Sequence, residues 1–249
     1  MTAAKATYRK LSDTMAKYHI RSIYLLIILY VIVVGIMKPS FLQLDNWMNL
    51  LRSVSVYGII SCGITFVMLT GRTDLSAGMM LTFLATISCY FVTPGIENQL
   101  LAIVVPILLG AVGGLVNGIL VGVIRLNSFV STLGMMSLYT GFVLLFIKQS
   151  PSLFGSQDMT VYRFLGQGSI LGIPTPVIIL AIVAIVSSIV LRRTVYGARI
   201  YAVGSNASAA RYSGISPAAI IVSVYTVSGL LTGLGAVVMC SRILSAQPK

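Results

Sequence analysis

The chain has 249 residues, of which 57% are hydrophobic and only 9% are charged, and its mean hydropathy is +0.98. A soluble domain of this size could not cover so much apolar surface with polar side chains, so the composition excludes a soluble globular protein and predicts a protein that lipid surrounds. The net charge of +12 would fit a nucleic-acid partner, but the basic residues lie between apolar runs, so no nucleic acid is expected.

The N-terminal segment, residues 1–22, is basic and is predicted to lie in the cytoplasm. The apolar run Ile23–Met37 follows it without a small-residue cleavage site, which indicates a retained helix rather than a signal peptide. One histidine and three cysteines without a CxxC pair cannot form a metal site, so no metal or cofactor is expected in this chain. The three cysteines are interpreted as small buried hydrophobic residues: Cys62, Cys89 and Cys240.

Six more apolar segments follow, so the predicted fold class is all-α, with about seven transmembrane helices in a domain over residues 23–249. When the N-terminus is placed inside and the segments alternate, the larger share of Lys and Arg falls on the cytoplasmic side, as in multi-pass proteins of the cytoplasmic membrane. The six segments are Val54–Thr70, Ala77–Thr93, Leu100–Ile124, Phe129–Ile147, Val177–Leu191 and Ala218–Cys240.

The connection GRTDLSAG, residues 71–78, interrupts the apolar sequence between the second and third segments. Glycine tolerates unusual backbone dihedrals, and Asp74 and Ser76 are N-cap candidates. Two interpretations remain open: a broken or re-entrant helix at membrane depth that lines a cavity, and a tight cytoplasmic turn capped by Asp74. The first would place Asp74, Ser76 and Gly78 beside that cavity.

Glycines recur at four-residue spacing in two segments, which predicts close helix packing through one small face. Asn117 lies among them, where its amide could bond across helices or line a path, and packing is the simpler expectation. The glycines are Gly110, Gly114, Gly118, Gly122, Gly229 and Gly233.

The long connection Arg192–Pro217 is expected inside. Asn206 can cap a short helix over Ala207–Ser213, Gly214 suits its C-terminal end, and Ser216-Pro217 can begin the last span. A face of small residues lacks the Trp, Phe and Leu of a helix on lipid head groups, which favours a protein partner over a lipid surface.

The quoted motifs resemble, in combination and order, the ribose/xylose-type permease family of ABC importers. GRTDLSAG is similar to the family's GGIDLSVG element, with Arg72 and Thr73 as departures. NGILVGVIRLNSFVSTLGMMSLYTG resembles another segment of that family, in which Tyr139-Thr140 replace a frequent Ala-Arg. A third likeness is LRRTVYGARIYAVGSNASAARYSGI, which begins at Leu191. Together they cover most of the chain from Val54 onward.

The resemblance implies the ABC importer permease fold, with a second permease subunit, identical or different, around a central translocation path. The motif of Asp74, Ser76 and Gly78 would lie near that path, with Asn117 as a further candidate. It implies a permease subunit of an ATP-driven, binding-protein-dependent importer of a ribose- or xylose-like monosaccharide. An extracytoplasmic sugar-binding protein would deliver the sugar, and a separate ATP-binding cassette subunit would hydrolyse ATP. The chain itself is not expected to be an enzyme, and no G-x-x-x-x-G-K motif occurs in it. Residues of the implied coupling helix are Asn206, Ala207, Ala209, Ala210, Arg211 and Gly214.

Family members continue for about three more helices, so the chain is expected to be incomplete, and a truncated product that does not transport is one alternative. An ion-coupled secondary transporter is the other. It would need ionisable groups within the membrane, for which only Asp74 is a candidate.

Overall fold

A computed structural model describes residues 24–92, 96, 98–147 and 159–243, so the basic segment 1–22 lies outside the described residues. The chain divides into two compact units, Met1–Leu50 and Leu51–Lys249. The first contains the apolar helix Tyr24–Met37, the 3₁₀ turn η1 (Pro39–Leu42) and the start of α2 (Leu44–Leu69). In it, the Asn46 amide donates to the Phe41 carbonyl at 2.9 Å.

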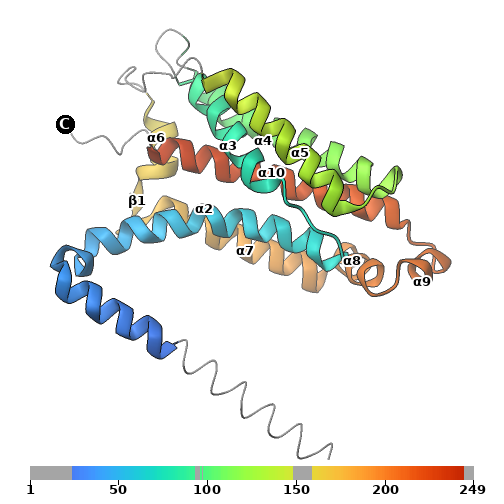
Figure 1. Cartoon of the computed structure of the whole chain (residues 1–249), viewed down its shortest axis with the longest axis horizontal. Helices are drawn as coiled ribbons and strands as arrows, with labels where there is room; N and C mark the ends of the chain where they lie inside the picture. Colours follow the sequence, from blue (N-terminus) through green and yellow to red (C-terminus); the bar gives the residue numbers. More distant parts are fainter. Residues whose placement is uncertain (1–23, 93–95, 97, 148–158, 244–249) are drawn as a thin grey trace, which may run out of the picture. The chain divides into compact units, whose positions relative to one another are not determined.

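The second unit is a bundle of helices with one short hairpin (Figure 1). Its elements after α2 are α3 (Ala77–Tyr90), α4 (Gln99–Gly118) extended by the π-helical turn η2 (Ile119–Val123), α5 (Ser128–Ile147), α6 (Thr160–Gln167), the strands β1 (Ser169–Ile170) and β2 (Ile173–Pro174), α7 (Thr175–Arg193), α8 (Val195–Ser205), α9 (Ala207–Tyr212) and α10 (Pro217–Ile243).

Five helices of the described residues are long and apolar enough to cross a membrane: α2, α4 with η2, α5, α7 and α10. The helix Tyr24–Met37 and α3 are apolar but shorter. Over their described residues, all seven predicted apolar segments are mainly helical, and the all-α polytopic class is confirmed. Helix α2 begins at Leu44, ahead of the apolar segment that starts near Val54, because Asp45, Asn46 and Asn49 lower the hydropathy of its first turns without ending the helix.

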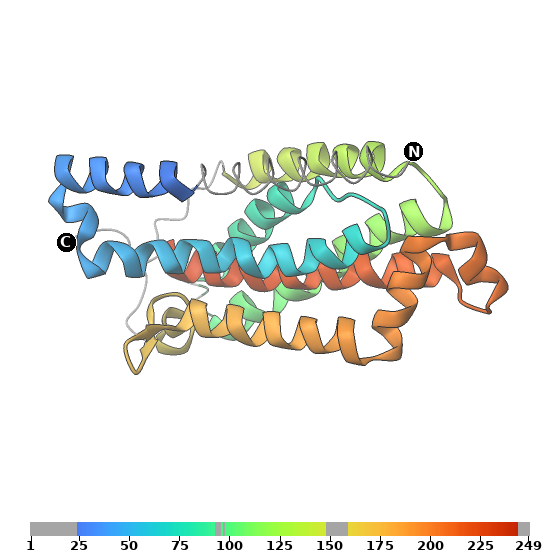
Figure 2. The ribbon, with the colours of Figure 1, turned by 90° about the horizontal axis from the view of Figure 1, so that it is seen from below.

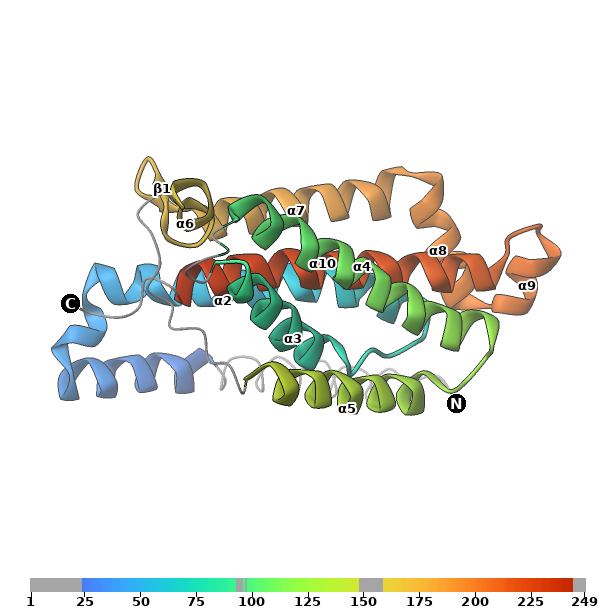
Figure 3. The ribbon, with the colours of Figure 1, turned by 90° about the horizontal axis from the view of Figure 1, so that it is seen from above.

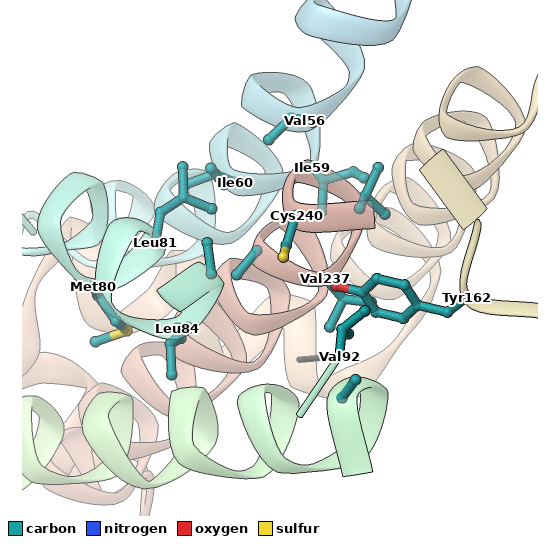
Figure 4. Close-up of a cluster of buried hydrophobic side chains, with 14 of the residues drawn as sticks. Val56, Ile59, Ile60, Met80, Leu81, Leu84, Val92, Tyr162, Val237 and Cys240 are labelled. Carbon is teal, nitrogen blue, oxygen red and sulfur yellow. The ribbon is translucent and has the colours of Figure 1, made fainter. Parts of the chain in front are cut away.

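Helix α10 lies at the centre of the second unit. Figures 2 and 3 show α2 and α4 running along it, with α3 between α10 and α5. Buried apolar side chains from α2, α3, α6 and α10 meet in one cluster, in which Ile59, Leu84 and Val237 are labelled (Figure 4). Because more of α10 than of any other spanning helix is buried, its neighbours are positioned by contact with it.

The predicted glycine face holds α4 directly against the backbone of α10. A Cβ added at Gly114 would collide with the Tyr225 carbonyl, and one at Gly118 would lie 2.7 Å from the Val222 Cα. The contact is reciprocal, because Gly229 faces the backbone of α4 at Gly110. A Cβ added at Gly122 would lie 3.0 Å from the Ala218 carbonyl oxygen, and one added at Gly233 would lie 2.6 Å from the Pro106 carbonyl oxygen. All six glycines thus lie where the backbones of α4, η2 and α10 approach closely.

Two of the cysteines are joined, which corrects their interpretation as small buried hydrophobic residues. Cys89, near the end of α3, forms a disulfide with Cys240, near the end of α10, with Cα atoms 6.2 Å apart. Their 151-residue separation gives no local motif, and the pairing follows only once α3 and α10 are adjacent. Cys62 is free.

Replacing Gly114 with valine should destabilise the bundle by about 1–3 kcal/mol, because the new side chain would force α4 and α10 apart. The melting temperature of the purified protein in detergent measures this. Gly134→Val is the matched control, since an added Cβ there meets no atom within 4 Å. Equal melting temperatures for the two variants would contradict the described contact.

The disulfide predicts how many thiols react with an alkylating reagent under denaturing conditions. Without reduction, only Cys62 should be alkylated, and reduction should expose two more thiols to the reagent. Intact-protein mass spectrometry counts the added groups. The control is Cys62→Ser, in which no cysteine should be alkylated before reduction. Three alkylated cysteines before reduction would rule out the pairing.

Candidate functional site

The first candidate site is the break between α2 and α3. Helix α2 ends at Leu69, Gly71 adopts a positive φ of 73°, and the chain runs without regular structure to Ser76. Figures 1 and 3 show this connection turning back from the end of α2, near α8, to the start of α3 beside the middle of α10. The connection therefore leads back into the bundle. It is not a short turn at the end of the bundle.

Side chains of two other helices bind the backbone of the break. The Thr132 hydroxyl of α5 accepts from the Leu75 N–H at 3.2 Å, and the Ser128 hydroxyl accepts from the Thr73 N–H at 3.4 Å. The Tyr225 hydroxyl of α10 donates to the Thr73 carbonyl at 2.7 Å. A chain segment that lacks helical hydrogen bonds inside an apolar bundle needs such partners, because an unpaired backbone group there is costly.

Asp74, Ser76 and Asn117 form one polar chain that ties the break to α4. The Asp74 carboxylate accepts from the Ser76 N–H at 3.0 Å and from its hydroxyl at 2.7 Å. The Ser76 oxygen in turn accepts from the Asn117 side-chain amide at 2.8 Å. Ser76 and Asn117 are fully buried. The burial of Ser76 and Asn117 fits the broken-helix interpretation.

Two details differ from the prediction for this motif. Ser76 occupies the position before α3, but its side chain does not cap that helix because it is engaged by Asp74 and Asn117. Gly78 is exposed and has open space around it, so the structure does not bring it into the network with Asp74.

Two buried oxygens near the break have no hydrogen-bond partner among the described residues: Asn117 Oδ1 and Tyr139 Oη. The Tyr139 hydroxyl lies 2.5 Å from the Cβ position of Gly113, one helical turn before Asn117 on α4. The neighbourhood of Asp74 thus keeps unused hydrogen-bonding capacity, which is what a polar substrate or water can occupy.

The second candidate site is α9, the short helix between α8 and α10. Its predicted caps are confirmed: Asn206 Oδ1 accepts from the N–H groups of Ser208 and Ala209, each at 3.0 Å. Gly214 has a φ of 79°, and the Ile215 N–H returns to the Ala210 carbonyl at 3.0 Å. The Ser216 hydroxyl accepts from the Ala219 N–H at 3.4 Å, at the start of α10.

Helix α8, which sequence reasoning missed, supports α9. Gly204 of α8 packs against the Leu69 carbonyl at the end of α2, and Gly197 packs against the Leu191 carbonyl of α7. The Tyr196 hydroxyl lies 2.8 Å from the Ser223 hydroxyl of α10. These contacts with three spanning helices position α9 at the end of the bundle opposite α6 (Figure 1).

Most of the predicted α9 residues are exposed, with one exception. Ala207, Ala209 and Arg211 face outward, but Ala210 is buried against the bundle, so it cannot belong to a docking face. Sequence reasoning missed Tyr212, whose side chain is 93% exposed. An aromatic residue beside an arginine on a face of small residues is typical of a protein-binding surface.

Tyr225→Phe should lower the stability of the purified protein by about 1–3 kcal/mol, because it leaves the Thr73 carbonyl without its donor. Tyr57→Phe removes a hydroxyl from a tyrosine that is 64% exposed and serves as the control. Thermal melting in detergent compares the two. If Tyr225→Phe has the same melting temperature as Tyr57→Phe and the parent protein, the hydrogen bond from Tyr225 to Thr73 does not stabilise the break.

Comparison with known proteins identifies relatives over nearly the whole chain. The ribose import permease protein RbsC of Bacillus subtilis is 36% identical over 225 residues, which are 90% of this chain and 69% of that protein. RbsC of Escherichia coli K12 is 36% identical over 230 residues, 92% and 71% of the two chains. The D-allose transport system permease protein AlsC of E. coli K12 is 32% identical over 226 residues, 90% and 68%.

No solved structure matches the chain. The family described as "Branched-chain amino acid transport system / permease component" matches residues 46–249, which include the break, the glycine contact and α9. With that match, and with relatives of at least 30% identity along most of its length, the chain belongs to this family of permease components.

Proposed function

We propose that the chain is the membrane-spanning permease subunit of an ATP-driven, binding-protein-dependent importer of a monosaccharide. The relatives named above are named for ribose import or D-allose transport, and their likeness covers about nine-tenths of this chain. The wider family description mentions branched-chain amino acids, but the individual relatives favour a sugar. A second permease subunit and a sugar-binding protein outside the membrane complete the transporter.

The observation that carries this proposal is the construction of α9. Helix α9 is capped at both ends and supported by α8. A short turn connects it to the central helix α10. A rigid helix mounted in this way can transmit a push to the middle of the bundle. The ATP-binding subunit docks on α9, and its closure on ATP moves α10.

The proposed orientation places α9 in the cytoplasm and α6, with the Cys89–Cys240 disulfide, outside. Two arginines end α7 on the α9 side, Arg192 and Arg193, in agreement with the cytoplasmic excess of positive charge. Disulfides persist in oxidising compartments, which supports an extracytoplasmic location for the other end. The N-terminus then lies in the cytoplasm.

The polar network at the break is proposed to border the translocation path. A sugar exposes many hydroxyl groups, and Asn117 Oδ1 and Tyr139 Oη have unused capacity to accept or donate hydrogen bonds. Because α3 is only 14 residues long and its start is bound by side chains of α4, α5 and α10, a movement of α10 reaches the break directly.

Gly214→Val should abolish ATP-dependent sugar uptake while the chain still inserts into the membrane. A β-branched residue is strained at a φ of 79°, so the end of α9 would shift away from its partner. The assay is uptake of radiolabelled ribose into proteoliposomes that contain the chain, its ATP-binding subunit and its sugar-binding protein.

Gly172→Val is the matched control, because Gly172 has a φ of 81° and equal open space but lies in the hairpin beside α6. It should still bind the ATP-binding subunit and stimulate its hydrolysis. Wild-type uptake by Gly214→Val would argue against the coupling role of α9, and uptake that needs a proton gradient and no ATP would overturn the importer assignment.

A further inference from the structure

Beside α9, and lined partly by it, lies a cavity of about 550 Å³. Its walls come from the α2–α3 connection, the end of η2 with the following turn, α9, and the first turns of α10. Each of the first three contributes one arginine: Arg72, Arg125 and Arg211. Segments far apart in the sequence thus bring three arginines to the walls of one cavity.

This positive charge is not balanced inside the cavity. No carboxylate is among the described residues that line it. The only acidic residues that the structure describes are Asp45, at the start of α2, and Asp74, whose carboxylate is engaged by Ser76. Three cations around one cavity repel each other until an anion enters, so the site is built to receive negative charge. Guanidinium groups bind carboxylates in a planar, two-pronged geometry.

The backbone conformation of Arg125 indicates that its side chain has a function. Arg125 has a φ of 64°, a left-handed conformation that favours glycine or asparagine. The turn is fixed on both sides, because the Ile124 N–H bonds to the Ile119 carbonyl and the Leu126 N–H to the Leu120 carbonyl, each at 3.0 Å. An arginine in such a turn costs stability, and its charge in the cavity supplies a reason for it.

The surroundings favour a protein carboxylate over a lipid phosphate. Tyr212, next to Arg211, extends into solvent, and the remaining exposed residues of α9 are small. A surface that bound lipid would add large apolar side chains around the cations, whereas tyrosine with arginine is the composition of protein contact sites.

We propose that the Arg72–Arg125–Arg211 cavity receives an acidic segment of the ATP-binding subunit, with Tyr212 packed beside it. The proposal rests on the proposed function, in which that subunit docks on α9. It adds a second point of attachment: the partner holds α9 and, through Arg72 and Arg125, also the break and the α4–α5 turn. One docking event then reaches α3, α4 and α10 together.

The test is binding of the ATP-binding subunit from the uptake assay to the chain in nanodiscs of neutral phosphatidylcholine, measured at several salt concentrations. Replacing all three arginines with glutamine should weaken binding by about tenfold or more and reduce its dependence on salt. Replacement by lysine should restore much of the affinity, since it keeps the charge. Arg199→Gln, an exposed arginine of α8 outside the cavity, is the matched control and should bind normally.

Melting temperatures equal to that of the parent protein show that the variants are folded. If the glutamine variant binds normally while Gly214→Val does not bind, α9 holds the partner without the cavity and this inference fails alone. If the unchanged chain does not bind the ATP-binding subunit, the proposed function fails and the inference with it. A loss that appears only in nanodiscs with anionic lipid would assign the cavity to lipid head groups and overturn the inference.

Discussion

The contact between the backbones of α4 and α10 is the constraint on which the rest of the second unit depends. In lipid, two apolar helices gain little from hiding their side chains, so close van der Waals contact must hold them, and glycine permits it. Gly114 meets the Tyr225 carbonyl and Gly118 meets Val222, which fixes how the two helices are aligned. Asn117 and Tyr225, which hold Ser76 and Thr73, lie at this same contact. The geometry of the break is therefore a consequence of the glycine spacing.

Hydropathy and capping residues predicted the helical framework because both signals are local. The seven apolar segments and the ends of α9 could be predicted from neighbouring residues, as could the start of α10 at Ser216-Pro217. Helix α8 could not, because its sequence VYGARIYAVGS mixes glycine, arginine and aromatic residues, and its stability comes from packing against α2, α7 and α10. The Cys89–Cys240 pair has the same origin, since only tertiary structure makes α3 and α10 neighbours.

Individual residues of the candidate sites could be predicted from the sequence, but their arrangement in space could not. Asp74, Ser76 and Asn117 drew attention separately, as polar groups in apolar sequence, and the structure joins them in one network. Ser128 and Thr132 gave no signal, because hydroxyl groups near a helix start commonly bond their own backbone. Tyr225 was hidden among the apolar residues of its helix. Arg72 and Arg125 seemed to be ordinary loop charges until the fold placed them beside Arg211.

The disulfide between the ends of α3 and α10 restricts how the helices of this bundle can move relative to one another. It ties the two helices together at the end opposite α9, and the part of α10 between α9 and the disulfide, Pro217 to Cys240, is about 36 Å long. Helices joined at one end can separate only by pivoting there, so displacement grows with distance from the joint. The break, which contacts α10 at Tyr225 between these two ends, would move less than α9 but in step with it. The disulfide at one end of the bundle thus acts as a fixed pivot, about which α10 can rotate relative to α3.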